Sequence, residues 1–168
     1  MGVPTHVMEY SGETVASMGR GVGPLQFLGP LRALNGAERW NIVFYALPPG
    51  KSYEDIAGEP TLEYLQAAGK ADAMTIEIRK PGGEQWGADW VRYVVGHPHD
   101  GNPPLDVPID FPNSTQTVSA AEIFDAEEAA QLFMSYHRTG DIPAEYILRP
   151  IEGYTAGGEL IRIGVATA

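Results

Sequence analysis

The sequence predicts an α+β fold: a single domain, residues 1–168, with a mainly antiparallel sheet of about five to six strands and two principal helices packed on it. A chain of 168 residues is long enough to bury a core without disulfides. Several short segments alternate apolar and polar residues between Pro- and Gly-rich turns, as β-strands do. Two other segments repeat apolar residues every three or four positions, as helices do.

The clearest element is a helix–turn–strand unit in residues 125–150. Asp125 is a suitable N-cap, and Gly140 suits the left-handed conformation that ends many helices. Residues 145–149 then alternate as a strand does. The apolar face of the helix is formed by Ala126, Ala129, Phe133 and Tyr136.

The N-terminal region predicts a strand followed by a helix. Residues 5–10 alternate and indicate the first strand. Residues 14–18 can begin a helix, which the glycine-rich run at 19–23 interrupts as a flexible hinge. Pro24 is well placed to begin the first principal helix, and Pro30 predicts a kink inside it. The apolar stripe of this helix is Leu25, Leu28, Leu31 and Leu34.

The middle of the chain predicts a central strand, a helix and a hairpin. Residues 41–47 form a continuous apolar run, which is typical of a strand buried on both faces. Residues 60–68 indicate a helix. Residues 74–80 and 90–95 alternate on either side of a loop that contains Trp86, and they predict a β-hairpin.

A Pro-rich segment separates this hairpin from the principal helix of residues 125–140. Its prolines predict an irregular loop over residues 96–112, because proline cannot donate to a strand ladder. Residues 115–120 indicate a short strand. Residues 160–165 indicate a last strand, so that residues 152–168 form either a final strand or an ordered tail.

Composition excludes several classes of function. The chain has no cysteine, which excludes a disulfide scaffold, a thiol nucleophile and a cysteine-ligated metal. No apolar run reaches membrane-spanning length and no secretory leader opens the chain, so we expect a cytoplasmic protein without a membrane partner. The net charge of −11 opposes binding to nucleic acid.

The acidic residues are concentrated in one part of the sequence. Residues 100–145 contain nine carboxylates against Arg138 alone, which places −8 of the net charge there. A field of this sign attracts a basic partner. Solubility alone is the alternative explanation of the same charge.

The end of the chain resembles the Imm1-type immunity proteins of bacterial polymorphic toxin systems. The family usually has a Trp in the strand after the turn, where this sequence has Tyr146-Ile147-Leu148. The resemblance implies a cytoplasmic protein that neutralises a cognate secreted toxin by forming a direct complex with it. The residues that match are Glu127, Ala129, Ala130, Phe133, Thr139, Gly140 and Pro143.

An immunity protein of this charge is expected to bind a basic, nuclease- or deaminase-like toxin domain through its acids, without a cofactor. The acids would occupy the place of the substrate phosphates in the toxin cleft. Trp86 is a second candidate, as an exposed apolar anchor. The candidate acids are Asp100, Asp106, Asp110, Glu127 and Glu128.

The alternative is a small metal-dependent enzyme or ligand-binding domain that uses His97, His99 and Asp100. His6 or His137 could complete such a metal site. The spacing matches no metalloenzyme motif, and no nucleophile motif is present. We therefore expect no metal and assign no catalytic residue.

Overall fold

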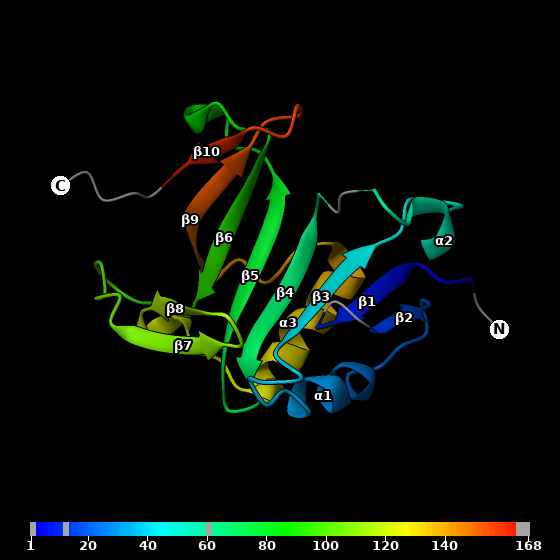
Figure 1. The fold of residues 1–168 in the computed structure, drawn as a ribbon, viewed down its shortest axis with the longest axis horizontal. Coiled ribbons are helices and arrows are strands. Elements are labelled where there is room, and N and C mark those ends of the chain that lie inside the picture. Colours follow the sequence, from blue (N-terminus) through cyan, green and yellow to red (C-terminus); the bar gives the residue numbers. More distant parts are fainter. Residues whose placement is uncertain (1–2, 12–13, 60–61, 164–168) are drawn as a thin grey trace.

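The computed structural model describes residues 3–11, 14–59 and 62–163. It is an α+β fold with an antiparallel eight-stranded sheet in the order β10-β9-β6-β5-β4-β3-β1-β2 and a separate two-stranded sheet, β7-β8 (Figure 1). The fold class is confirmed, and the number of strands exceeds the five to six expected.

The helices and strands follow one another along the chain with short connections. The strands are β1 (His6–Tyr10), β2 (Thr14–Met18), β3 (Asn41–Ala46), β4 (Tyr64–Lys70), β5 (Ala73–Pro81), β6 (Trp90–Gly96), β7 (Val107–Phe111), β8 (Ser114–Val118), β9 (Ile147–Tyr154) and β10 (Leu160–Arg162). The helices are α1 (Leu25–Arg32), α2 (Tyr53–Ile56) and α3 (Ala126–Thr139), with short 3-10 turns η1 (Glu84–Trp86) and η2 (Ala120–Glu122).

One face of the large sheet is covered by helices α1 and α3, which correspond to the two principal helices expected. In Figure 1, α3 lies behind the strands and α1 lies beside its start. The aromatic rings of Phe27 on α1, Phe44 on β3 and Phe133 on α3 are fully buried and pack against one another. Burial of such apolar surface is the main stabilising contribution to a fold of this size.

Helix α3 has the ends that the sequence predicts. The Asp125 carboxylate accepts a hydrogen bond from the backbone N–H of Glu128 at 2.9 Å. Gly140 ends the helix with φ at 77°, and its N–H donates to the Tyr136 carbonyl. The predicted apolar face of the helix is buried.

Two predicted helices are strands instead. Residues 14–18 form β2, because they pair with β1 in register from Thr14 to Met18. The helix predicted at residues 60–68 is replaced in its second half by β4, which pairs with β3 and β5; residues 60–61 lie outside the described residues. Pairing with neighbouring strands outweighs the weak local helix preference in both segments.

The Pro-rich segment is only partly irregular. Residues 107–111 form β7, which pairs with β8 from Val107 to Phe111. Among the described elements β7 pairs with no strand except β8, and such a position tolerates the proline at 108. Buried side chains of Ile109 and Val118 attach this hairpin to Val94 on the sheet face opposite the helices.

Candidate partner-binding surface

The sheet face opposite α1 and α3 presents a network of charged and aromatic side chains on strands β5, β6 and β9. The short helix α2 packs on the same face only at its β1–β3 end, through Tyr53 and Ile56. Cross-strand register places Arg79 opposite Arg92, and Arg92 opposite Glu152. Side chains that are directly opposite on neighbouring strands lie on the same face of a sheet. We define the open-face patch as Tyr64, Arg79, Trp90, Arg92 and Tyr154.

Arg92 is the centre of the network. Its guanidinium donates to Glu77 and to Glu152, each at 2.7 Å. The Glu77 side chain is only 3% exposed, and it also accepts from the Gln116 amide of β8 at 2.9 Å. Because a buried carboxylate is costly without partners, these contacts fix Glu77 and tie the β7–β8 hairpin to the large sheet.

The pKa values in the network follow from these contacts. Burial raises the pKa of Glu152, but hydrogen bonds from Tyr154 and Arg92 outweigh it and hold the pKa below its ordinary value. Burial, and then the hydrogen bond to Glu152, raise the pKa of Tyr154. Glu152 and Arg92 are therefore an ionised pair at neutral pH, and Tyr154 keeps its proton.

Arg79 differs from Arg92, because it forms no ion pair with any carboxylate in the part of the chain that the structure describes. Its guanidinium carbon lies 3.7 Å from the centre of the Tyr154 ring, a cation–π contact. Buried N–H groups of Arg79, Trp90 and Arg92 also lack an acceptor among the described residues. Trp, Tyr and Arg side chains gathered on one face are the residue types that most often dominate binding at protein interfaces.

Next to this patch lies an acidic segment, residues 98–118, which we call the acidic arm. It comprises the loop after β6 and the β7–β8 hairpin, at the lower left of Figure 1. Residues 93–137 contain no lysine or arginine. Asp100, Asp106 and Asp110 are all exposed, and none of them forms an ion pair with a described residue. Asp110 accepts a hydrogen bond from the Thr115 hydroxyl at 3.0 Å.

Glu127 and Glu128 differ from these three aspartates, because each of them contacts a side chain of opposite or complementary character. Glu127 is exposed but paired with Arg32 of α1, at 2.7 Å. Glu128 is not the free acid that its position in the first helical turn predicts. One of its oxygens lies 2.8 Å from His97 Nε2, and the other accepts from the Tyr146 hydroxyl at 2.8 Å.

Trp86 does not project into solvent as an isolated anchor. It is half-buried in η1 and packs with Ala88, Val91 and Ile163. Its turn joins the ends of β5 and β6, whereas the acidic arm packs beside Val94 near the other end of β6. Trp86 and the three aspartates therefore do not form one cluster.

Of the two neighbouring histidines proposed as metal ligands, His97 is engaged in other contacts, whereas the buried Nδ1 of His99 has no hydrogen-bond partner among the described residues. His97 stacks on Phe124, with 4.3 Å between ring centres, and its Nδ1 lies 2.8 Å from the Ala121 carbonyl. Burial lowers the pKa of His97, but the hydrogen bonds with Glu128 and Ala121 outweigh it and raise the pKa above its ordinary value. Within residues 3–11, 14–59 and 62–163, no three His, Asp or Glu side chains are grouped to hold a metal ion.

Sequence reasoning missed the open-face patch. The alternation in residues 74–80 places Arg79 outward, and the same reasoning applies to Arg92 and Glu152 on their own strands. The hairpin of residues 74–80 and 90–95 was predicted, and the missing information was that β9 pairs with β6 and that both principal helices lie on the other face.

No described helix combines the length and apolar character required to cross a membrane. Comparison of the chain with protein-family models, curated proteins and solved structures finds no significant match.

Proposed function

We propose that this chain is an immunity protein that binds a cognate secreted toxin domain in the cytoplasm and blocks it. The observation that carries the proposal is the sheet face opposite α1 and α3. It combines the open-face patch of Trp, Tyr and Arg side chains with an arm that has exposed aspartates and neither lysine nor arginine. The resemblance of the last third of the chain to Imm1-type immunity proteins supports the same function.

The acidic arm supplies long-range attraction in this proposal. The net charge is −11, and the free carboxylates of Asp100, Asp106 and Asp110 lie on the arm without a neutralising partner of their own. A basic toxin cleft that binds phosphates, as in a nuclease or deaminase, is attracted to such a surface. Attraction of this kind mainly increases the association rate.

The open-face patch supplies the short-range contacts. Arg79 forms no ion pair with a carboxylate of the described residues and is already positioned by stacking on Tyr154, so a partner carbonyl or carboxylate can accept from it at little entropic cost. Tyrosine, tryptophan and arginine are the residues that most often dominate binding energy at protein interfaces.

A metal-dependent enzyme is the weaker alternative. Both ring nitrogens of His97 lie within hydrogen-bonding distance of Glu128 or the Ala121 carbonyl, so a metal ion would have to displace one of these contacts. A metal ion that displaced Glu128 from His97 would also disturb the hydrogen bond that the Tyr146 hydroxyl donates to Glu128.

The experiment is reconstitution with the toxin domain encoded next to this gene. The two proteins are co-expressed and purified, and toxin activity is assayed with increasing amounts of this chain. The proposal predicts a 1:1 complex and complete loss of toxin activity at stoichiometric amounts. Toxin activity that is unchanged by an excess of this chain would refute it.

A further inference from the structure

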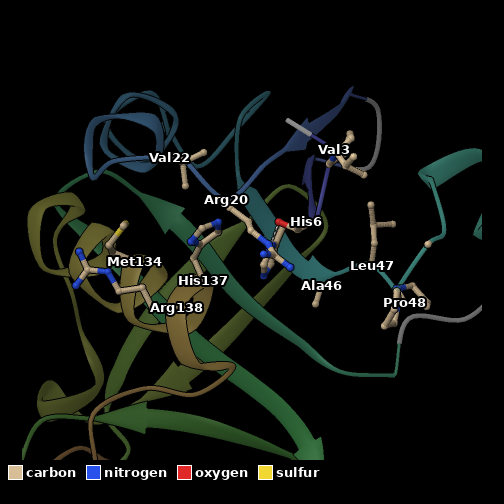
Figure 2. Close-up of a pocket in the computed structure, with 15 residues that line it drawn as sticks. Val3, His6, Arg20, Val22, Ala46, Leu47, Pro48, Met134, His137 and Arg138 are labelled. Atoms are coloured by element: carbon tan, nitrogen blue, oxygen red, sulfur yellow. Dashed lines mark hydrogen bonds between the residues drawn. The ribbon is translucent and has the colours of Figure 1, made fainter. Parts of the chain in front are cut away.

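A cleft of about 1110 Å³ opens on the helix side of the molecule, away from the open-face patch. It is bounded by β1, the segment 20–22, the end of β3 with residues 47–50, and the last turn of α3 (Figure 2). His6 of β1 lies on the same sheet face as the buried Met8, so the cleft belongs to the helix-covered face. This volume lies slightly above the usual range of small-molecule binding sites, about 300–1,000 Å³.

The charge of the cleft is opposite to that of the protein. Arg20, Arg138, His6 and His137 line it, and no aspartate or glutamate does. Neither Arg20 nor Arg138 pairs with a carboxylate in the described ranges. In a chain with twice as many acidic as basic side chains, two unpaired arginines in one cleft are a local excess of positive charge.

Ring contacts and a hydrogen bond position the two histidines that line the cleft. The rings of His6 and His137 lie 4.5 Å apart, and His6 stacks on Phe44. Nε2 of His137 lies 2.9 Å from the Gly19 carbonyl, while its buried Nδ1 has no partner among the described residues. Burial, and then the neighbouring His137, lower the pKa of His6 to about 4, so His6 is neutral at neutral pH.

The remaining wall is apolar. Val22, Leu47, Pro48 and Met134 line it, and Figure 2 shows Leu47 and Pro48 across the cleft from His137. Arg20 and His6 line the same cleft. A cationic group beside an apolar wall matches a molecule with an anionic head and an apolar body.

We infer that this cleft binds a small organic anion, with its anionic head on Arg20 beside the histidine pair and its apolar body against Leu47, Pro48 and Met134. Arg20 donates to the head in a charge-assisted hydrogen bond, which is stronger than a neutral one. The arginine and histidine side of the cleft lies on the sheet face opposite the open-face patch, while Leu47 of its wall shares an apolar cluster with Tyr64 of the patch.

The test uses the full-length chain without toxin and two probes: anilinonaphthalene sulfonate, which has an apolar body and an anionic head, and inorganic phosphate, which has the head alone. Probe fluorescence is titrated for the parent, Arg20→Gln and the matched control Arg162→Gln, an exposed arginine outside the cleft. Arg20 is exposed and without an ion pair, so its replacement leaves the fold intact.

We expect saturable one-site binding of the sulfonate probe, weakened at least about tenfold by Arg20→Gln and unchanged by Arg162→Gln. Phosphate should compete with the probe only at far higher concentration, since it lacks the apolar body. Arg138→Gln is a second variant and should weaken binding less. Equal affinity of parent and Arg20→Gln, or the absence of saturable binding to the parent, would overturn the inference.

Discussion

His97 and Glu128 show how the chemistry of a residue depends on its neighbours. Each has the side chain of a functional candidate, a metal ligand in one case and a partner-binding acid in the other. In the structure they contact each other at 2.8 Å, and Glu128 also binds Tyr146. Together they connect the loop after β6, the start of α3 and the residue just before β9, which is a structural role.

The contact between His97 and Glu128 makes stability depend on pH. The pKa of His97 is raised in the folded state, so the protonated ring stabilises the fold. This stabilisation is complete below the ordinary pKa of histidine and is lost as pH rises through the pKa of His97 in the folded protein. His97→Gln keeps a hydrogen-bonding side chain without titration. We expect the parent to lose more unfolding free energy than this variant between about pH 6 and about pH 8 in denaturant melts. Equal losses of unfolding free energy in the parent and in His97→Gln would show that protonation of His97 does not stabilise the fold.

Gly69, at the end of β4, is constrained by its backbone. Its φ is +130°, and a Cβ there would lie 2.6 Å from the Ala73 carbonyl oxygen. We expect Gly69→Ala to lower the unfolding free energy by about 2–3 kcal/mol, because both strain and overlap must be accommodated.

Gly157 provides the matched control for this substitution. Its φ lies outside the left-handed region, and a Cβ there would meet only Thr155 Oγ1, at 3.8 Å. Gly157→Ala should change the unfolding free energy by less than about 0.5 kcal/mol. Similar effects of the two substitutions would contradict the strained geometry at Gly69.

At the scale of elements, α3 could be predicted from the sequence and β2 and β4 could not. Helix α3 has an N-cap, a C-terminal glycine and an apolar stripe, and all of these signals act within a few residues. Strand β4 is defined by its pairing with β3 and β5, and β2 by its pairing with β1. Such pairing leaves only a weak signal in the local sequence, where Leu62, Tyr64, Leu65 and Ala68 also fit a helix.

The central contact of α3 with the sheet is Phe133, which is fully buried between Phe27 and Phe44. We expect Phe133→Ala to cost about 3–5 kcal/mol of unfolding free energy, the usual cost of removing a buried aromatic ring. Leu25→Ala is the matched control, because Leu25 is 77% exposed on α1 and should cost less than about 0.5 kcal/mol. A loss below about 1 kcal/mol for Phe133→Ala would show that this helix face is not core.

At the scale of the whole molecule, the sequence predicts the acidic segment but not the surface to which it belongs. Asp100, Asp106 and Asp110 are exposed as expected. Glu127, in contrast, pairs with Arg32 of α1, a helix that is far away in the sequence. The open-face patch depends on which sheet face the helices cover, and no local pattern encodes that choice. The candidate site was therefore only partly predictable.

Charge on the acidic arm should control how fast a basic toxin associates. We expect the combined variant Asp100→Asn, Asp106→Asn and Asp110→Asn to associate at least about tenfold more slowly at low salt, with the difference shrinking as salt rises. The control variant neutralises three exposed acids elsewhere, Glu59→Gln, Glu145→Gln and Glu159→Gln, with the same change in net charge. Stopped-flow binding measures both. Equal slowing by the two variants would mean that net charge, not the arm, steers association.

The most direct test of the central claim, that the partner binds the open-face patch, is the dissociation constant of the toxin complex for Arg79→Ala. Arg79 forms no ion pair with a described carboxylate, so a specific loss of affinity reports on the partner. Arg162→Ala is the control, and thermal melts of both variants check the fold. We predict that Arg79→Ala weakens binding at least about tenfold while Arg162→Ala does not. Unchanged affinity of a folded Arg79→Ala variant would contradict the account and place the interface on another surface.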